Sequence, residues 1–166
     1  FFASRSVPSP YTNPGRTDGL IITKKSSHIR KIDVRLERWE RIARESIKQC
    51  GRSLLPLIHQ PMSFDQMISE SASYGEKITF WEKSTTSIDE LREIQKAKEE
   101  SSSQNQDRVI VMIGPEGGFS EQEIELARHK GFKDFSLGNR ILRAETASVA
   151  ACTLIQNIFG DIGKKR

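Results

Sequence analysis

Three glycines and a glutamate follow the abrupt end of an apolar run, and these residues carry the clearest potential for chemistry. They lie in the stretch "VIVMIGPEGGFSEQEIELARHKGF", whose turn is Gly114–Gly118. Glycine lets a backbone approach a ligand closely or adopt positive φ. The carboxylate of Glu116 would repel an anion, so it suits a ligand that has hydroxyl groups to bind or a positive charge. An adenosine that carries a sulfonium meets both conditions, and a tight structural turn is the alternative interpretation of this stretch alone.

A phosphate site is the first expectation for a loop before a helix N-terminus, and the sequence argues against it. The GxGxxG spacing is absent, because the glycines fall at positions 114, 117 and 118, and no Lys-Ser or Lys-Thr follows as in a P-loop. The missing fingerprint also disfavours an oxidoreductase built on a Rossmann sheet. A non-catalytic RNA- or nucleotide-binding α/β module stays open as another interpretation.

The helix after the turn is fixed by strong local signals. Ser120 as N-cap and Glu123 form a capping box, and Phe119 and Ile124 occupy the positions of a hydrophobic staple. Gly131 follows the helix as its C-cap. These devices predict a turn that is held rigidly enough to form part of a binding site.

A second stretch, "SLGNRILRAETASVAA", also stands where a strand ends and a helix begins. In it Arg140 and Arg143 flank two aliphatic residues, and Glu145 opens the helix. A glutamate complements the positive N-terminal end of the helix macrodipole, whereas an arginine opposes it. Arg143 is therefore expected to have a partner, which is either Glu145, Glu116 or an anionic substrate.

Strand and helix patterns alternate along the 166-residue chain and predict how these two stretches are positioned. The alternation is typical of βαβ units, so we expect an α/β fold with a parallel sheet flanked by helices. In such sheets ligands bind beyond the carboxyl ends of the strands, where both glycine-containing stretches lie. The predicted strands are "LLPLIH" (54–59), "EKITFWEK" (76–83), "RVIVMIG" (108–114) and "KDFSLG" (133–138), and the predicted helices cover residues 34–50, 63–72, 87–100, 121–130 and 144–159. The continuous apolar run at 108–114 predicts a strand buried on both faces, and loops are expected at residues 8–19 and after the helix at 87–100. Ser63 and Gln66 predict a capping box at the start of the second helix, and Gly160 is expected to end the last one.

Composition and charge narrow the class of protein. With 36% hydrophobic and 29% charged residues, the chain is expected to be globular, and no apolar run approaches the length of a membrane span. Residues 1–52 hold twelve Lys/Arg against five Asp/Glu, which suits a polyanion such as nucleic acid or, equally, a solvated helix face. Cys50 and Cys152 are expected to be buried thiols of a cytoplasmic protein, because no CxxC or histidine cluster indicates a disulfide or a metal site.

The last predicted helix has apolar residues on two sides. Its main stripe falls at helical spacing and comprises Ala147, Ala150, Ala151, Leu154, Ile155 and Ile158. Val149, Cys152 and Phe159 lie off that stripe. We therefore expect a second apolar neighbour, which is either the helix around Trp39 or a second copy of the chain.

The two glycine-containing stretches together resemble a known enzyme family. "IGPEGGFSEQEIELA" and "LGNRILRAETA" look like the paired motifs of the RsmE family of ribosomal RNA uridine-N3 methyltransferases, in the SPOUT, or trefoil-knot, superfamily. "RWERIARESIKQCGR" is similar to the helix before their knotted half, and "ASRSV" to the segment after their first methyltransferase strand. The resemblance covers about Arg5 to Phe159. It implies a C-terminal trefoil knot, although general topology rules count against knots.

The resemblance also implies a domain organisation and partners. Residues 1–166 would form a single SPOUT methyltransferase domain that is truncated at its N-terminus, without the family's N-terminal PUA-like RNA-binding domain. The implied partners are 16S ribosomal RNA or the small ribosomal subunit, together with a second copy of the chain in a homodimer. No membrane or metal is implied, and the expected location is the cytoplasm.

The cofactor implied by the resemblance is S-adenosyl-L-methionine, and the implied reaction is methylation of N3 of a uridine in small-subunit 16S ribosomal RNA. The cofactor would lie bent against three strand ends. Its expected contacts are Trp81, Glu82, Ile113, Gly114, Pro115, Glu116, Gly117, Gly118, Leu137, Gly138, Ile141, Leu142, Arg143, Thr146 and Ala147.

The expected catalytic residues are Arg5, Arg143 and Glu145. N3 of neutral uracil must lose a proton, which Glu145, Glu116 or water would accept while Arg143 or Arg5 stabilises the uracil anion. Stabilisation by arginine is the favoured interpretation. The expected RNA-binding residues are Lys24, Lys25, Arg30, Lys31 and Arg52.

Overall fold

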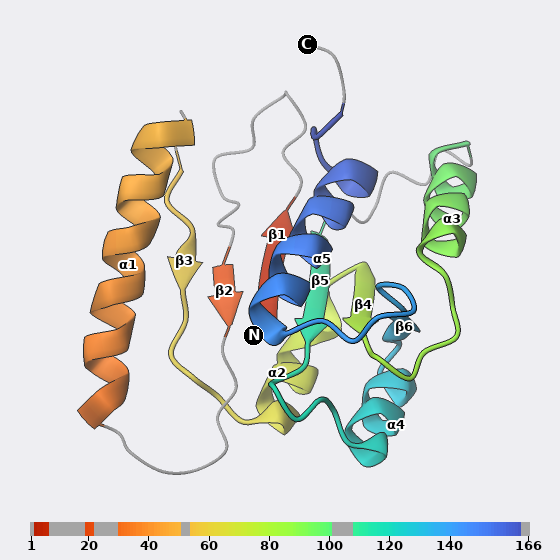
Figure 1. The fold of residues 1–166 in the computed structure, drawn as a ribbon, viewed down its shortest axis with the longest axis horizontal. Helices are drawn as coiled ribbons and strands as arrows, with labels where there is room; N and C mark the ends of the chain where they lie inside the picture. The colour runs from red at the N-terminus through yellow and green to blue at the C-terminus, as the bar shows by residue number, and fades with distance from the viewer. Residues whose placement is uncertain (1, 7–18, 22–29, 51–53, 101–107, 164–166) are drawn as a thin grey trace.

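The computed structural model describes residues 2–6, 19–21, 30–50, 54–100 and 108–163, and it describes side chains for residues 34–50, 54–97 and 108–163 (Figure 1). These residues form a six-stranded sheet in the order β3-β2-β1-β5-β4-β6. The strands are β1 (Phe2–Ser6), β2 (Gly19–Ile21), β3 (Leu57–Ile58), β4 (Glu76–Phe80), β5 (Arg108–Ile113) and β6 (Lys133–Phe135). The helices are α1 (Arg30–Cys50), α2 (Phe64–Glu70), α3 (Ile88–Glu100), α4 (Glu121–His129) and α5 (Ala144–Phe159), with a 3-10 turn at Ser71–Ser73.

The sheet is parallel in the half that carries the glycine-rich turn and mixed elsewhere. Strand β4 pairs in parallel with β5 on one side and β6 on the other, and β2 pairs in parallel with β3. Strand β1 runs antiparallel to both β2 and β5. The predicted α/β architecture is thus confirmed, whereas a wholly parallel sheet is corrected at β1. Strand β1 contains the first four residues of "ASRSV", a segment that the resemblance assigned to the region after a strand.

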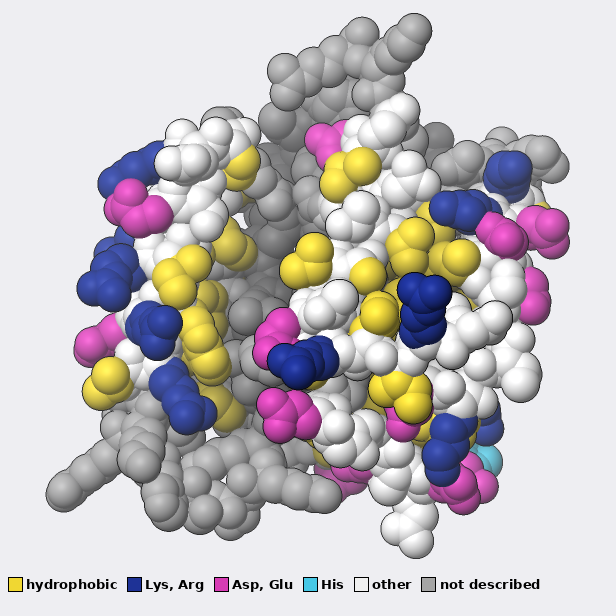
Figure 2. Space-filling view, in the orientation of Figure 1, with side chains coloured by type: hydrophobic (Ala, Val, Ile, Leu, Met, Phe, Trp, Pro, Cys, Tyr) yellow, Lys and Arg dark blue, Asp and Glu magenta, His cyan; other side chains and the backbone are white. Residues whose placement is uncertain are grey.

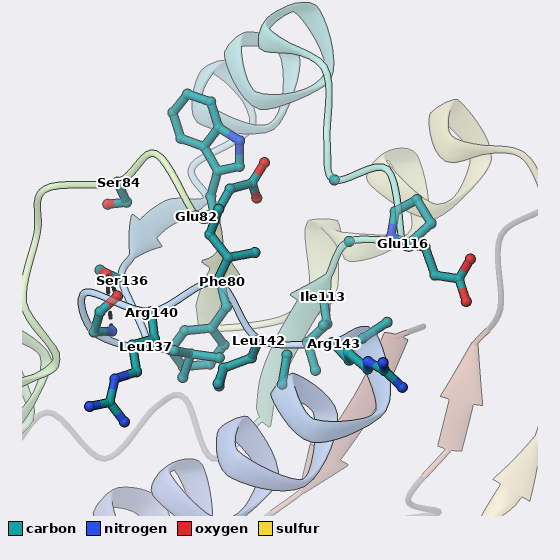
Figure 3. A pocket seen from close by; sticks show the side chains of 18 of the residues that line it. Phe80, Glu82, Ser84, Ile113, Glu116, Ser136, Leu137, Arg140, Leu142 and Arg143 are labelled. Atoms are coloured by element: carbon teal, nitrogen blue, oxygen red, sulfur yellow. Dashed lines mark hydrogen bonds between the residues drawn. The ribbon is translucent and has the colours of Figure 1, made fainter.

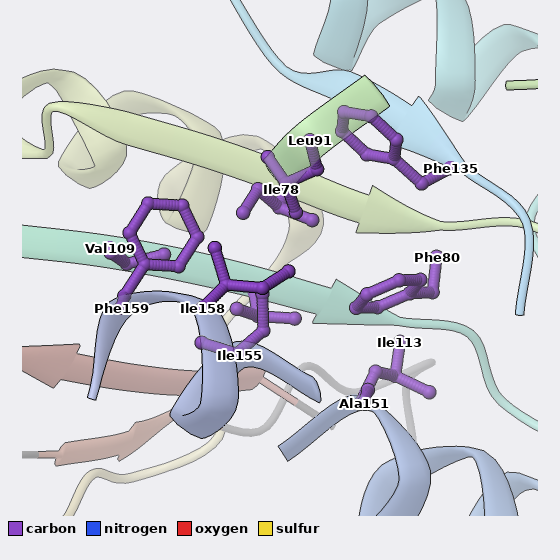
Figure 4. Close-up of a cluster of buried hydrophobic side chains, with 11 residues drawn as sticks. Ile78, Phe80, Leu91, Val109, Ile113, Phe135, Ala151, Ile155, Ile158 and Phe159 are labelled. Carbon is purple, nitrogen blue, oxygen red and sulfur yellow. The ribbon is translucent and has the colours of Figure 1, made fainter. Parts of the chain in front are cut away.

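Strand β5 is the centre of two hydrophobic clusters, because its side chains alternate between the two faces of the sheet. Ile110 and Met112 pack on one face with α2 and α4. Val109, Val111 and Ile113 pack on the other face with α3 and α5 (Figure 4). A strand that is buried on both faces reads as a continuous apolar run, as its sequence predicted.

The local helix signals are confirmed. Ser63 and Gln66 form the capping box that opens α2, and α5 ends against Gly160 as its C-cap. Helix α1 begins four residues earlier than predicted and ends at Cys50. The four predicted strands are all present, but each is shorter than predicted. The residues at their ends lie outside the ladder pairs with neighbouring strands and belong to the loops. The loop predicted around residues 8–19 and the polar segment after α3 lie outside the described residues, apart from Gly19 in β2.

Two expectations about exposure are corrected. Cys50 and Cys152 are exposed rather than buried, because α1 and α5 turn these positions away from the sheet. Phe159 is buried in the chain's own core, so only Val149, at 69% exposure, is a large apolar side chain of α5 that faces away from it. Helix α1, which contains Trp39, lies beside β3, and β3 and β2 stand between it and α5 (Figure 1). Helix α1 therefore does not cover the side of α5 that carries Val149. In the described part of the chain, none of the helices combines the length and the apolar character that crossing a membrane requires.

Candidate functional site

A pocket of about 580 Å³ lies at the carboxyl ends of β4, β5 and β6 (Figure 3). The ladder explains why three distant segments meet there, since Phe80 at the end of β4 pairs with both Ile113 and Phe135. The strands therefore end at one level, and the loops that follow them form the walls. The lining residues are Phe80, Trp81, Glu82, Ser84, Ile113, Gly114, Pro115, Glu116, Gly117, Gly118, Ser136, Leu137, Gly138, Asn139, Arg140, Ile141, Leu142, Arg143, Ala144 and Ala147.

The glycines of the first turn serve different purposes. Gly118 has a φ of +69°, and a Cβ added there would lie 2.5 Å from Oε1 of Glu82. A Cβ at Gly114 would meet the Gly118 backbone and the Phe119 ring at 3.3 Å. At Gly117 an added Cβ would meet nothing within 4 Å. Local packing therefore explains the glycines at 114 and 118, and it leaves the one at 117 free to serve close approach of a ligand.

The turn is anchored to α4 as predicted. The Glu123 backbone N–H donates to Oγ of Ser120 over 3.3 Å, and the Ser120 backbone N–H donates to the Glu123 carboxylate over 2.8 Å. Phe119 and Ile124 are both buried in the cluster beneath the helix. Within the turn, the Gly118 N–H donates to the carbonyl of Pro115 over 2.9 Å. These bonds fix the wall that holds Glu116.

A hydrogen-bonded network ties the loop after β4 to β6. The Trp81 N–H donates to the carbonyl of Phe135 over 3.1 Å, and the Ser84 hydroxyl donates to the carbonyl of Asp134 over 3.0 Å. Further along, the Ser136 N–H donates to the carbonyl of Thr86 over 2.9 Å. The two loops that these strands carry are thereby held at a fixed separation across the pocket.

An ion pair between α4 and β6 involves Asp134, the residue whose carbonyl accepts the Ser84 hydroxyl. Nε of Arg128 donates to Asp134 over 2.7 Å, and the Asp134 side chain is 12% exposed. The hydrogen bond from Arg128 lowers the pKa of the Asp134 carboxyl below its ordinary value. The same guanidinium lies 5.6 Å from the centre of the Trp81 ring, and the ammonium of Lys83 lies 5.9 Å from it. Trp81 and the loop that follows it are therefore held by contacts with two cations, one of them on α4.

The third wall leads into α5 through Arg143. Arg143 is the N-cap of the helix, with φ −62° and ψ 150°, and its side chain makes no capping hydrogen bond. Its carbonyl accepts the N–H of Ala147 over 2.8 Å. Among the side chains that the structure describes, none forms an ion pair with Arg143, so the expected pairs with Glu145 and Glu116 are not made. An anionic ligand is the remaining partner from that expectation.

Most of the residues that the sequence analysis assigned to a cofactor line this pocket, and Thr146 does not, because it points from α5 to solvent. Six further residues line the pocket and were not among those predicted. They neighbour the predicted ones in the same three segments, so extending each motif by a few positions would have found them. They are Phe80, Ser84, Ser136, Asn139, Arg140 and Ala144.

The expected catalytic residues are not all brought together. Arg143 lines the pocket, whereas Glu145 is exposed in the first turn of α5 and does not. The backbone of Arg5 pairs with Val109, which lies four positions before Ile113 along β5, a distance of about 13 Å. Arg5 therefore lies towards the far end of β5 from the pocket.

The expected RNA-binding residues fall at the margin of the description. Arg30 and Lys31 form the first turn of α1, and their side chains lie outside the described residues. Lys24, Lys25 and Arg52 lie outside the described residues altogether. Across the described residues, no group of three or more His, Cys, Asp and Glu side chains is arranged to hold a metal ion.

The fold and the pocket define a class, the α/β proteins that bind a ligand where neighbouring parallel strands end. Within that class the sequence matches one family model, described as an RNA methyltransferase domain, over residues 19–156. The chain belongs to this RNA methyltransferase family.

Two relatives illustrate the similarity. Ribosomal RNA small subunit methyltransferase E of Buchnera aphidicola subsp. Acyrthosiphon pisum is 36% identical over 127 residues, which cover 76% of this chain and 46% of the relative. The protein of the same name from Mesomycoplasma hyopneumoniae is 32% identical over 122 residues, which cover 74% of this chain and 48% of the relative. The chain thus spans about half the length of the curated relatives it matches.

Solved structures give the same fold. Ribosomal RNA small subunit methyltransferase E from Neisseria gonorrhoeae, bound to S-adenosyl methionine, has a TM-score of 0.65 and 27% identity, over 84% of this chain and 53% of that one. A protein from Legionella pneumophila, solved in complex with the cofactor SAM, has a TM-score of 0.61 and 29% identity, over 84% of this chain and 54% of that one.

Proposed function

We propose that this chain is the catalytic part of a methyltransferase that uses S-adenosyl-L-methionine to methylate N3 of a uridine in small-subunit 16S ribosomal RNA. The observation that carries the proposal is the pocket at the ends of β4, β5 and β6, where carboxylates and guanidiniums that pair with no described side chain surround apolar side chains. Membership of the RNA methyltransferase family supports it. So do the printed names of the relatives and the cofactor bound in the similar solved structures.

The residues of the pocket fit this cofactor by their chemistry. Phe80, Leu137 and Leu142 supply apolar surface for an adenine ring, and Figure 3 draws them in the middle of the pocket. Glu82 and Glu116 make no ion pair with a described side chain, so their carboxylates are available to ribose hydroxyls or to a positive charge. When bound, the cofactor supplies a methyl group on a good leaving group.

The work left to the protein is alignment and charge stabilisation. The rigid walls would hold the methyl carbon and the uracil nitrogen in line, which removes much of the entropic barrier. Arg143 forms no ion pair with a described side chain, so its guanidinium is available to stabilise the anion that forms when N3 loses its proton. Glu116 lines the pocket and Glu145 does not, which favours Glu116 or water over Glu145 as the proton acceptor. Arg5 stays a prediction that its position on β1 does not support.

Calorimetry separates this proposal from a Rossmann-type dinucleotide enzyme. S-adenosylhomocysteine should bind and raise the melting temperature, because a ligand that binds only the native state stabilises it by mass action. NAD should do neither. If NAD binds and S-adenosylhomocysteine does not, the proposal is overturned.

A transfer assay separates it from a non-catalytic binding module. Radiolabelled S-adenosyl-L-methionine should transfer its methyl group to 16S ribosomal RNA or to small subunits, and nuclease digestion should place the label on N3 of uridine. Arg143→Lys is the matched variant, since it keeps the charge and loses the planar fork. Cofactor binding without any transfer, to free RNA or to subunits, would favour the binding module.

The same family resemblance supports finer proposals. Residues 1–166 would form a single SPOUT methyltransferase domain with its C-terminal segment in a trefoil knot, acting in the cytoplasm as a two-fold homodimer. Val149 is the proposed interface residue, because it is 69% exposed on α5. Light scattering should report about twice 18.8 kDa, and Val149→Arg should shift the protein to monomer. A wild-type monomer at high micromolar concentration would contradict the homodimer.

A further inference from the structure

A row of arginines along α1 forms a second charged surface, on the opposite part of the sheet from the pocket. Arg35, Arg38 and Arg41 recur every three residues, and all three are exposed. Arg44 and Lys48 continue the row towards the end of the helix, and both are exposed. Figure 2 shows Lys and Arg side chains along the part of this helix whose side chains the structure describes.

The packing of α1 fixes which face carries this charge. Leu36 is 7% exposed, and Trp39, Ala43 and Ile47 are half-buried on the same side of the helix. This apolar stripe holds α1 beside β3 (Figure 1). Because the stripe must face the sheet, the arginine row must face outward.

Acidic neighbours compensate only part of the row. Arg44 lies 3.6 Å from Glu40, and Lys48 lies 2.9 Å from Glu45. Among described side chains, none forms an ion pair with Arg35, Arg38 or Arg41. These three guanidiniums are spread over about 9 Å of helix axis, so they form a local concentration of positive charge with no direct ion pair to a described side chain.

A shallow hollow of about 530 Å³ adjoins the row where α1 faces the segment before β3. It combines cations with aliphatic surface, and its lining residues are Arg41, Arg44, Glu45, Ile47, Lys48 and Leu55. Guanidiniums bind phosphate oxygens in a bidentate manner, and aliphatic side chains offer contact surface to a sugar or a base. None of these residues lines the methyl-transfer pocket.

We propose that the outer face of α1 and this hollow form a docking surface for the RNA backbone, separate from the pocket. The proposal rests on the proposed function, because the partner is the RNA that is methylated. Charge complementarity carries it, since RNA presents a regular row of phosphates to three unpaired guanidiniums. The surface positions the substrate and takes no part in the chemical step.

The test compares two triple variants that remove the same formal charge. Arg35→Gln/Arg38→Gln/Arg41→Gln removes the unpaired part of the row. Arg92→Gln/Lys96→Gln/Lys133→Gln removes three cations from α3 and β6, at the other edge of the sheet. Binding to protein-free 16S ribosomal RNA is measured between 50 and 300 mM salt for each protein.

The slope of log affinity against log salt should become shallower by about 2 to 3 in the first variant, since each phosphate contact contributes about 0.7 to 0.9. The second variant should keep the wild-type slope. Both should bind S-adenosylhomocysteine and melt as the wild type does, because none of the six residues lines the pocket or belongs to the core.

Three outcomes would overturn the inference. An unchanged slope in the first variant would make the row a solvated helix face. Equal changes in both variants would assign the effect to net charge. Stronger binding of the wild type to anionic vesicles or polyglutamate than to RNA would assign the surface to another class of partner. If the wild type fails to bind S-adenosylhomocysteine, that separate result contradicts the proposed function and not the docking surface.

Discussion

Gly118→Ala tests how the glycine turn and the loop after β4 depend on each other. The φ of +69° at this position costs alanine about 1–2 kcal/mol. The new Cβ would lie 2.5 Å from Oε1 of Glu82. That oxygen is the end of an exposed, flexible side chain, so it can move away and add little to the loss of stability. We expect the free energy of unfolding to fall by about 1–2 kcal/mol.

Gly118→Ala should weaken ligand binding by more than a change in the turn alone would, because it also displaces Glu82. Displacing Glu82 removes a charged hydrogen-bond partner from the pocket wall, which is worth about 1.5–3 kcal/mol. The dissociation constant of S-adenosylhomocysteine should therefore rise about 10- to 150-fold. Urea denaturation measures the stability, and calorimetry measures the affinity.

Two further variants make the reasoning refutable. Gly117→Ala is the matched control, because its Cβ would meet nothing within 4 Å and stability should hardly change. Glu82→Ala/Gly118→Ala should bind the ligand about as weakly as Glu82→Ala alone. If the two substitutions instead add in full, the affinity loss comes from the turn and the argument through Glu82 is wrong. A stability loss below about 0.5 kcal/mol for Gly118→Ala would refute the argument from φ.

Three other substitutions probe the rest of the site and the core. Arg128 lowers the pKa of Asp134 in the folded protein, so the pair adds stability above the ordinary carboxyl pKa, and this stability is lost as pH falls through the lowered pKa. Asp134→Asn should therefore lower the free energy of unfolding at neutral pH and make its decrease below about pH 4 less steep, as measured by urea denaturation. An unchanged decrease of stability in acid would contradict this prediction. Ile155→Ala, at a position 4% exposed, should cost about 2–5 kcal/mol of unfolding free energy, and a cost below about 1 kcal/mol would show that the core beneath α5 is loosely packed. Arg143→Lys should lower kcat far more than it raises the dissociation constant of the cofactor, whereas a loss of helical circular dichroism would assign Arg143 a structural role.

Signals between near neighbours in the chain predicted this structure well. The capping boxes at Ser63 and Ser120 need only residues three positions away, and both are formed. The apolar run of β5 needs only its own composition to indicate burial on both faces. The position of the pocket followed from these elements, because parallel strands present their carboxyl ends, and the loops after them, at one edge.

Features that depend on distant pairing were beyond local patterns. Strand β1 runs antiparallel to its partner β5, which lies more than one hundred residues away in the chain. Phe159 and Val149 lie on one predicted side of α5, yet only Phe159 packs into the chain's own core, whereas Val149 is 69% exposed. Whether Arg143 reaches Glu116 depends on the separation of two walls, which no spacing along the sequence reports.

The three walls of the pocket are completed at different times while the chain is synthesised. Segments that hold Glu82 and Gly118 leave the ribosome before the segment that holds Ala147, and chains fold from their N-terminal parts first. A ligand held by all three walls therefore has nothing to bind until α5 has been made, so the β4–β5 pair must first be held together by its own packing. The proposed cofactor would then stabilise the finished molecule by mass action, and not the β4–β5 pair that forms before it.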